Sequence, residues 1–578
     1  MPHSKRARLH SLGFASALRE TFREGYSRHD FLRDLVAGVT VGIIAIPLAM
    51  ALAIASGVSP EYGLYTAIIA GFLIALSGGS RYSISGPTAA FVVILYPVTQ
   101  AFGLAGLLVA TLMAGMILVA LAVARLGRLI EYIPESVTLG FTSGIAIVIA
   151  VLQLKDFFGL DVEASSEAFI ERLIDLIAAL PGLNLANTCV AALTLGILIV
   201  WPKLKLPIPG HLPAIILGAL LAAAFIHMGW SVDTIGSRFS YELPDGQMGS
   251  GIPPFLPSFE WPWMRPGPNG EPLEWSWSTI RALLPAAFSI AMLGAIESLL
   301  CAVVLDGMSG RRHHANGELL GQGLGNLAAP FFGGITATAA IARSATNYKA
   351  GAKSPISSMI HALVVLAGLL VLAPMLSWLP MASMAALLVM VAWNMSETPK
   401  VVALLKRAPK GDIIVLLTCL SLTVLFDMVL AISAGIVMAS LLFMRDLAGM
   451  TRFNDITQQR KHVPNGVPEG WKVLKVSGPL FFAAAERVFD ELAAYIQDQQ
   501  GVVLYMDGVP LLDAGGLHGF ERFTVFCEKN NIHVITADLQ FQPLRTMARA
   551  GIKPAPGVQF SPTLEEALVL VNSVAHSR

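Results

Sequence analysis

Two short stretches combine glycine or proline with small hydroxyl residues inside long apolar surroundings. The first is Ser83–Phe91, in which Gly86-Pro87 precedes an apolar run, and the second is Gly333–Ser344, in which two glycines precede a small-residue segment. Proline suits the first turn of a helix and Ser or Thr its N-cap, so each stretch predicts a short helix that begins inside the apolar region. Two such N-termini facing each other would offer unpaired N–H groups and positive dipole ends to an anion. Two ordinary glycine kinks are the alternative.

Two ionisable residues accompany these stretches. Glu297 lies well inside an apolar run, where an acid costs roughly 2.5–3.5 kcal/mol on insertion scales and is expected to face a cavity and serve a function. Arg343 lies about one turn into the second short helix, so its guanidinium could meet a bound carboxylate or Glu297. Glu297 is our candidate for carrying a coupled proton; a purely structural pair of Glu297 with Arg343 is the alternative.

The composition indicates that a membrane surrounds these elements. Of 578 residues, 55% are hydrophobic and 13% are charged, against about 25% charged in a typical soluble domain. The four cysteines follow no disulfide or metal-site spacing, and 39 Lys and Arg balance 39 Asp and Glu. We therefore expect a polytopic membrane protein with no nucleic-acid partner, no metal site, no cofactor and no catalytic residues.

Long apolar runs extend from about Leu35 to Met444 and predict roughly fourteen spans. They lie near 35–56, 61–77, 87–100, 103–124, 137–154, 183–201, 212–229, 280–305, 316–333, 338–348, 355–376, 380–394, 412–427 and 428–444. Asp427 is expected to lie in the turn between the last two spans. Seven spans per half give the second half inverted topology, and Lys and Arg concentrate in alternate loops, which predicts a cytoplasmic N-terminus.

The chain divides into three predicted regions. Residues 1–34 form a cytoplasmic N-terminal segment, 35–448 the transmembrane domain and 449–578 a cytoplasmic α/β domain. In the last region, predicted strands alternate with predicted helices. The strands lie near 471–476, 501–506 and 532–537, and the helices near 484–498, 514–528 and 541–551.

Two patterns that imitate binding motifs are given structural interpretations. Gly321-Gln-Gly-Leu-Gly325 follows no strand, so we expect a glycine-packed helix rather than a dinucleotide site. His313-His314 follows two arginines, which indicates a solvated basic loop rather than a metal site.

Five motifs are together specific enough to suggest a family. They are Ser85–Thr88, Glu297-Ser298, Gly321–Asn326, Ala342–Ser344 with Asn347, and Ala350–Pro355. These motifs resemble the SulP (sulfate permease) family of anion transporters, and stretches such as 41–53 and 292–307 are similar to its bacterial C4-dicarboxylate transporters. The resemblance implies a 7+7 inverted repeat with UraA-like core and gate domains, elevator motion, a homodimer, a bacterial inner-membrane location and a C-terminal STAS domain.

The resemblance also implies a binding site between the third and tenth spans, near the first and eighth. It implies that Glu297 takes part in cation coupling. It also implies that the substrate is bound by Ser85, Gly86, Pro87, Thr88, Thr338, Ala339, Ala340, Ile341, Ala342 and Arg343. Many relatives have Ser where this chain has Ala342 and a polar residue where it has Leu48. Fewer hydroxyls weaken side-chain recognition of a tetrahedral sulfate, whereas backbone N–H donors remain.

STAS relatives often carry a phosphorylatable serine in a loop that here reads Asp513-Ala-Gly-Gly516. Ala514 cannot be phosphorylated, so docking of a cytosolic partner is the remaining expectation, and the resemblance suggests acyl carrier protein.

No nucleotide-hydrolysis motif is evident in the sequence, so an ion gradient must supply the energy. Moving a dianion into a cell costs about 4.6 kcal/mol per 100 mV, and two protons would cancel that cost. We predict a secondary active, proton-coupled importer of C4-dicarboxylates such as succinate, fumarate or aspartate. The alternatives are a sulfate or bicarbonate transporter coupled to protons or sodium, a nucleobase carrier, and a sensor that transports nothing.

Overall fold

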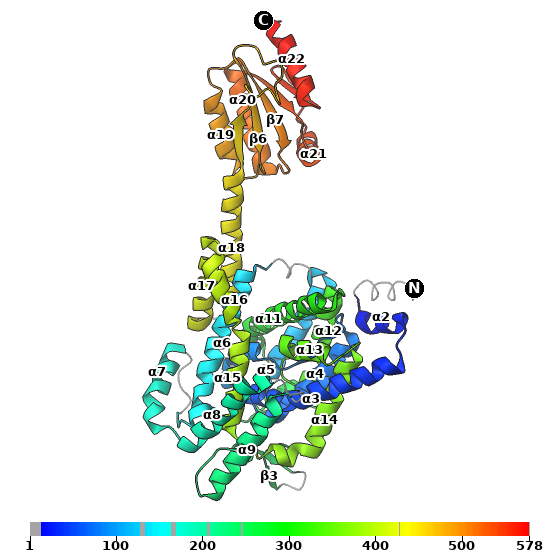
Figure 1. Cartoon of the computed structure of the whole chain (residues 1–578), viewed down its shortest axis with the longest axis vertical. Helices are drawn as coiled ribbons and strands as arrows, with labels where there is room; N and C mark the ends of the chain where they lie inside the picture. The colour runs from blue at the N-terminus through cyan, green and yellow to red at the C-terminus, as the bar shows by residue number, and fades with distance from the viewer. Residues whose placement is uncertain are drawn as a thin grey trace. The chain divides into compact units, whose positions relative to one another are not determined.

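The computed structural model describes residues 13–127, 133–162, 169–204, 209–243, 247–274, 276–426 and 428–576. The chain forms two compact units, Met1–Ile436 and Val437–Arg578. The first unit is built of helices and the second is an α/β unit, as the ribbon in Figure 1 shows.

Helices lie at all of the predicted spans. The long helices of the first half are α3 (Arg28–Ala55), α4 (Pro60–Ser77), α5 (Ala89–Val123), α6 (Glu135–Phe158), α8 (Leu185–Val200) and α9 (His211–His227). Those of the second half are α11 (Trp277–Ser309), α12 (Ala315–Ala328), α13 (Ile341–Lys349), α14 (Ile356–Leu376), α15 (Met381–Met395), α17 (Lys410–Leu425) and α18 (Met428–Met450). Within the described ranges, eight helices are long and apolar enough to cross a membrane.

Two differences from the predicted spans have local causes. The third and fourth spans form one helix, α5, interrupted at Gly103, whose φ of 65° is non-helical. The first span begins earlier, at Arg28, because Ser27 and Asp30 form a reciprocal capping box. The last apolar run divides into α17 and α18 as expected, while Asp427 itself lies outside the described residues.

Short helices that the apolar pattern did not indicate are α2 (Ser16–Glu24), α7 (Phe169–Ala179), α10 (Ile235–Arg238) and α16 (Thr398–Arg407). A small hairpin of β2 (Ser240–Glu242) and β3 (Met248–Ser250) joins α10 to the segment before α11.

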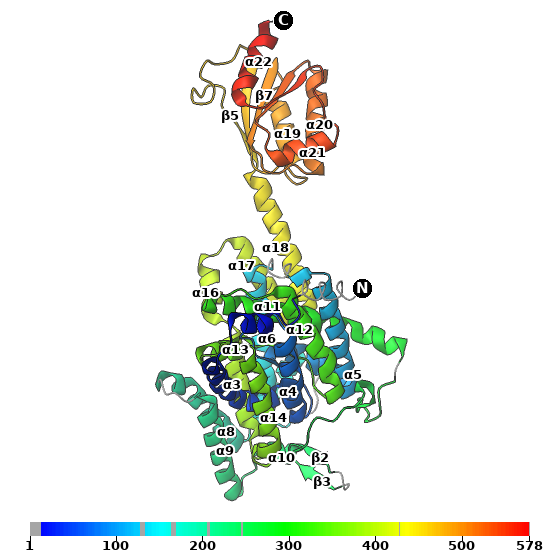
Figure 2. The same cartoon turned by 90° about the vertical axis from the view of Figure 1, so that its right-hand side faces the viewer.

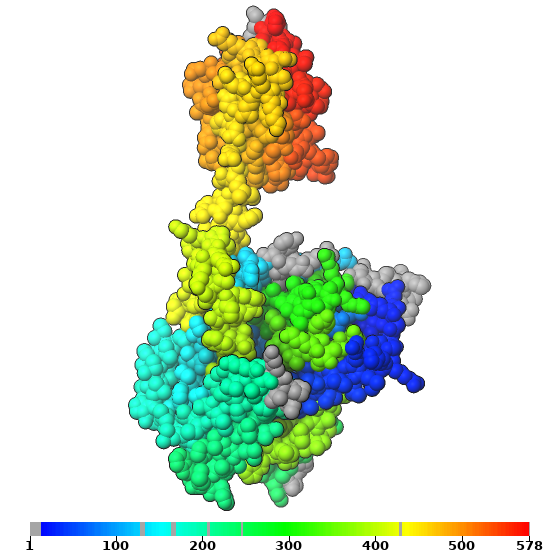
Figure 3. Space-filling model, viewed as in Figure 1, coloured from blue at the N-terminus to red at the C-terminus, as the bar shows by residue number. Residues whose placement is uncertain are grey.

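The helices of the first unit pack in two groups. One, the core group, contains α3, α4, α5, α11, α12, α13 and α14; the other, the gate group, contains α6, α8, α9, α15, α16 and α17. Contacts between the groups are fewer and run mainly from α15 to α3 and from α5 to α6. Both halves of the sequence contribute to each group. In the gate group, α8 and α9 from the first half contact α15 from the second, and in Figure 3 the teal surface of α8 and α9 lies beside yellow-green surface from the second half.

Glycines let α12 pack closely against its neighbours, as the sequence indicates. A Cβ atom at Gly323 would lie 2.7 Å from the Val119 side chain, and one at Gly321 would lie 2.6 Å from the Cα of Gly78. Larger residues would push α12 away from α4 and α5, so these glycines serve helix packing.

The second unit is a five-stranded sheet in the order β5-β6-β7-β8-β9. The strands are β5 (Arg452–Asp455), β6 (Trp471–Ser477), β7 (Gly501–Gly508), β8 (His533–Ala537) and β9 (Val558–Ser561), all parallel except β5. Alternate strand residues pack on one face against α19 (Ala485–Tyr495), α20 (Ala514–Lys529) and α21 (Phe541–Arg549), and on the other against α22 (Leu564–His576). Figure 2 shows these two layers of helices. All six predicted elements of this region are confirmed; β5, β9 and α22 are additional.

Candidate functional site

The two interrupted segments meet through a two-residue ladder. Strand β1 (Ser85–Gly86) pairs antiparallel with β4 (Thr338–Ala339), so that Ser85 lies opposite Ala339. Helix α5 follows β1 and α13 follows β4 within three residues. Because the two strands run in opposite directions, the helices leave the ladder in opposite directions and their N-terminal ends share one location. We call this location the paired helix start.

Neither helix is capped by the side chain of its own N-cap residue. Thr88, at the N-cap of α5, donates its hydroxyl instead to Oε2 of Glu297 at 3.0 Å. The N-cap of α13 is Ala340, which has no polar side chain to offer. The first N–H groups of a helix have no partner within the helix, so the two dipole ends are left for a ligand to neutralise.

Arg343 supplies a positive charge at the same place. Its side chain is 4% exposed, and Nη2 donates to the carbonyl oxygen of Pro87 at 2.7 Å. Nε and Nη1 have no hydrogen-bond partner, and among the described residues no carboxylate lies within 4.0 Å of the guanidinium. The alternative of a structural Glu297–Arg343 ion pair is therefore not what the structure shows. A buried charge without a hydrogen-bonded counter-charge is costly, and an anion would relieve that cost.

Helix α11 contributes to both sides of the paired helix start. Glu297 is only partly buried and accepts from Thr88, while the backbone oxygen of Gly294 accepts from the Thr338 hydroxyl at 3.1 Å. The residues at the start of α5 are buried, whereas Ala340 and Ile341 are partly exposed and Ala342 is exposed. Access to the paired helix start is therefore greater along α13 than along α5.

Three polar residues of α12, which sequence reasoning did not identify, hold the paired helix start in place. Oε2 of Glu318 accepts from the N–H groups of Gly79 and Ser80 at 3.1 and 2.9 Å. Gln322 donates to Glu318 and to Ser85 Oγ, both at 3.1 Å. Asn326 exchanges two hydrogen bonds of 2.8 Å with the backbone of residue 337. Their spacing of four residues puts them on one face of the helix, which is the signal that could have revealed them.

The loop after α13 is fixed by a buried carboxylate of α3. Oδ1 of Asp34 accepts from the N–H groups of Lys353 and Ser354 at 2.6 and 3.1 Å, and Oδ2 accepts from the hydroxyls of Ser354 and Tyr26. Asn347 adds hydrogen bonds to the backbone oxygen of residue 82 and to the hydroxyl of residue 357. These groups position the helix that carries Arg343.

The adjacent histidines have structural roles. His313 Nδ1 lies 2.8 Å from Asp306 Oδ2, and the ring of His314 accepts from the N–H of Gly317 at the start of α12. Within the described ranges, no group of three or more His, Cys, Asp or Glu side chains is placed to hold a metal ion.

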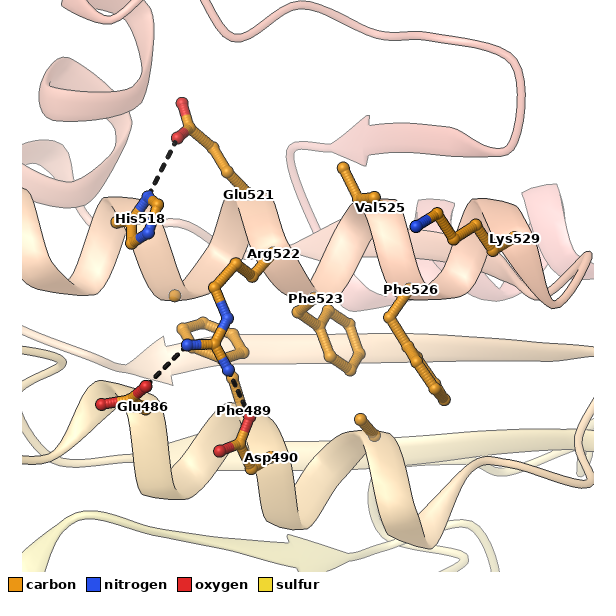
Figure 4. A pocket seen from close by; sticks show the side chains of 12 residues that line it. Glu486, Phe489, Asp490, His518, Glu521, Arg522, Phe523, Val525, Phe526 and Lys529 are labelled. Atoms are coloured by element: carbon orange, nitrogen blue, oxygen red, sulfur yellow. Dashed lines mark hydrogen bonds and ion pairs between the residues drawn. The ribbon is translucent and has the colours of Figure 1, made fainter.

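The α/β unit carries a surface cavity of about 450 Å³ between α19 and α20. Figure 4 shows Arg522 of α20 reaching Glu486 and Asp490 of α19, at 2.6 and 3.0 Å. Glu521 points away from Arg522 toward His518, at 3.9 Å. The lining therefore holds three carboxylates and two cations, Arg522 and Lys529, a balance that does not favour an acidic partner.

The segment Asp513–Gly516 is held by the side chain of Asp513. Its Oδ1 accepts from the N–H of Gly516 and its Oδ2 from the N–H of Phe482, so the side chain caps α20. Ala514 is the first residue of that helix.

Known proteins resemble both units. Residues 31–419 match the model of the sulfate permease family, and residues 461–567 match that of the STAS domain. The chain is 38% identical to the "Putative sulfate transporter YvdB" of Bacillus subtilis, over 92% of this chain and 95% of that protein. It is 30% identical to the bicarbonate transporter BicA of Picosynechococcus, over 79% of this chain and 80% of that protein.

Solved structures agree with these matches. The transmembrane domain of a cyanobacterial BicA is 28% identical and superposes with a TM-score of 0.60, covering 71% of this chain and 98% of that one. The murine solute carrier 26 family member A9 shares the fold with a TM-score of 0.80 at 18% identity, covering 96% of this chain and 93% of that one. The chain belongs to the sulfate permease family and carries a C-terminal STAS domain.

Proposed function

We propose that this anion transporter of the sulfate permease family binds its substrate at the paired helix start. The observation that carries the proposal is the buried Arg343 guanidinium, which retains N–H groups without a partner beside two uncapped helix N-termini. The substrate would lie against the residues that the family resemblance implies, Ser85–Thr88 and Thr338–Arg343. Unpaired backbone N–H groups at the starts of α5 and α13 and the Arg343 side chain would hold it.

We propose a small carboxylate as the substrate, namely a C4-dicarboxylate such as succinate, fumarate or aspartate. The hydroxyls of Ser85, Thr88 and Thr338 already have hydrogen-bond partners in the protein. Recognition then rests on the guanidinium and on backbone donors, and guanidinium geometry suits a carboxylate. Bicarbonate or sulfate is the second candidate, because relatives at 30% and 38% identity carry names that specify those anions.

We propose proton-coupled import across a bacterial inner membrane, with both termini in the cytoplasm and the core group moving against the gate group as an elevator. Glu297 supports this proposal, since it is an acid within a membrane-spanning helix and its carboxylate contacts Thr88 at the N-cap of α5. Two protons per dianion would offset about 4.6 kcal/mol per 100 mV. A homodimer and a cytosolic partner of the STAS domain, such as acyl carrier protein, complete the proposal.

Uptake into proteoliposomes tests the substrate and the site together. We expect saturable uptake of radiolabelled succinate that a proton gradient stimulates and that excess sulfate does not inhibit. Arg343→Gln should lower kcat/KM for succinate at least tenfold, since a charge-assisted contact is worth roughly 1.5–3 kcal/mol.

The same variant provides the folding control. Removing a buried charge that has no hydrogen-bonded carboxylate should leave the melting temperature of Arg343→Gln equal to or above that of the wild type. Competition by sulfate or bicarbonate but not by succinate would replace the dicarboxylate with the second candidate, and full activity of Arg343→Gln would refute the site.

A further inference from the structure

A buried histidine near Arg343 has no part in the function proposed so far. His361 lies on α14 and is 0% exposed. Among the described residues, neither of its ring nitrogens has a hydrogen-bond partner, and the hydroxyl of Ser358 on the same helix has none either. Buried polar side chains in native proteins are nearly always paired. An imidazole with two unpaired nitrogens is therefore a group that a binding partner could engage.

His361 and Arg343 belong to one buried cluster. Asn347 of α13 donates to the Ser357 hydroxyl of α14 at 2.9 Å, which joins the two helices. Arg343 lies four residues before Asn347, and His361 lies four residues after Ser357, so each shares a helix face with one partner of this hydrogen bond. The Arg343 guanidinium lies close enough for its charge to act on the imidazole.

The other ionisable groups around His361 lie at helix ends. Helices α3 and α4 pack against α14, and α13 is joined to it. Their remaining ionisable residues are Arg28, His29, Asp30, Arg33 and Asp34 at the start of α3, Glu61, Tyr62 and Tyr65 at the start of α4, and Tyr348, Lys349 and Lys353 at the end of α13 and in the loop after it. Among the described residues, the charge that acts on the imidazole is that of Arg343.

The charges of this cluster balance before a dianion binds and need two protons to balance afterwards. Glu297 of α11 acts on Arg343 from beyond ion-pair distance, so one negative charge offsets one positive charge. A bound dianion with one proton on Glu297 would leave one net negative charge inside the membrane, which is costly. A proton on the His361 imidazole would restore neutrality, because two cations would then face the two charges of the substrate.

We propose that His361 carries the second proton of this transporter and takes it up only while a dianion is bound. A lone pair of the neutral imidazole accepts a proton from the solvent that enters with the anion, which forms an imidazolium, and the proton returns to solvent when the anion leaves. Without the anion, a second positive charge near Arg343 is repelled, whereas a bound carboxylate attracts it.

This inference rests on the proposed function and names the acceptor of the second proton. Because the bound carboxylate holds the imidazolium proton tightly, the pH profile of uptake reports Glu297, whereas the number of protons taken up per anion reports both residues.

Calorimetry of anion binding to the purified full-length chain counts these protons. Titrations of succinate near neutral pH, in buffers of different ionisation enthalpy, give the number of protons taken up per anion bound. We expect this number to be lower by about one in His361→Gln than in the wild type. The matched control is His211→Gln, which removes a histidine of the gate group at the start of α9 and should keep the wild-type number.

The proton number is a ratio, so it separates proton uptake from folding. If His361 only packs against its neighbours, His361→Gln should bind succinate less tightly but take up as many protons per anion as the wild type, which would overturn the inference. In proteoliposomes, an inside-negative potential should slow succinate uptake by His361→Gln more than uptake by the wild type, because the loss of one proton leaves a net negative charge to be moved. Equal sensitivity to the potential would also contradict the inference.

Titration of sulfate separates this inference from the substrate assignment. If sulfate binds in place of succinate and its proton uptake falls in His361→Gln, the role of His361 stands and the dicarboxylate assignment fails. If succinate binding is lost in Arg343→Gln while His361→Gln and the wild type take up equal numbers of protons, the proposed function stands and His361 is not the second carrier.

Discussion

The hydrogen bond from Thr88 to Glu297 links the charge state of one carboxyl group to one helix N-terminus. The Thr88 hydroxyl can cap α5 or donate to Glu297, and in the structure it donates to Glu297. A proton on Glu297 would remove the charge that holds this donor. The hydroxyl would then be free to donate to a substrate carboxylate bound at the N-terminus of α5.

Substitution of Glu297 tests this link. If import is proton-coupled as we propose, succinate uptake by wild-type proteoliposomes should rise as the external pH falls. Glu297→Gln should transport slowly and with a flat pH profile, whereas Glu297→Asp should keep a pH dependence. An unchanged pH profile in Glu297→Gln would remove Glu297 from the coupling mechanism.

A site residue could be predicted from the sequence only where its own residue type sets it apart from its neighbours. Gly86-Pro87 and Arg343 stand out because their types are unusual within apolar runs. Gln322 and Asn326 were hidden inside a glycine-rich motif whose packing role is also real. The absence of a Glu297–Arg343 ion pair could not be predicted, since it depends on where two side chains from distant helices point.

At the scale of elements, an ion-pair cluster fixes α2 to the loops beside it. Glu24 contacts Arg81 at 2.5 Å and Arg311 at 2.6 Å, and Glu20 contacts Arg81 at 3.2 Å. Hydrogen bonds from Arg81 and Arg311 lower the pKa of Glu24 to about 2. The carboxylates of these pairs are about half exposed. Such pairs contribute about 0.2–1 kcal/mol each, so the cluster orients α2 rather than determining the fold.

The lowered pKa of Glu24 determines how the stability of α2 changes with pH. Because the pKa is lower in the folded chain than its usual 4.5, the stabilisation is complete above pH 4.5 and is lost as the pH falls toward 2. We expect protease protection of α2 in the detergent-solubilised chain to decrease between pH 4.5 and 3. Glu24→Gln should show weaker protection at neutral pH and little further change on acidification. An equal acid response in both proteins would contradict this assignment.

The elements themselves were largely predictable because span length and apolarity are local properties. Short amphipathic helices such as α2 and α7 were missed, since they are neither long enough nor apolar enough to register as spans. The β1–β4 ladder could not be predicted, because it joins residues 85–86 to residues 338–339 and consists of two pairs. The matching positions of these two segments in the two halves of the sequence indicated only that the segments are equivalent, not that they pair with each other.

At the scale of the whole molecule, α18 is the covalent connection between the two units. Nη2 of Arg487 donates to the backbone oxygen of Ala448, in the last turn of α18, and to that of Thr451, the residue after the helix, both at 3.0 Å. Helix ends need such partners. Arg487 therefore joins the end of α18 to the first helix of the STAS domain.

Replacing Arg487 tests this connection. Arg487→Ala should weaken the end of α18 by about 1 kcal/mol, and hydrogen exchange of residues 448–451 in the full chain should become faster. Exchange in β6 and β7 should stay as in the wild type, because the sheet core does not depend on this contact. Arg487→Lys is the matched control that keeps the charge. Unchanged exchange at residues 448–451 in Arg487→Ala would show that Arg487 does not hold the end of α18.

The two-pair ladder between residues 85–86 and 338–339 also constrains how a ligand can be released. Main-chain hydrogen bonds join the two halves of the paired helix start, so the two halves cannot easily separate. If the substrate binds there as we propose, it would cross the bilayer without separation of the two halves of the site. A substitution in either half of the ladder should therefore change the apparent substrate affinities measured from the two sides of the membrane in the same direction.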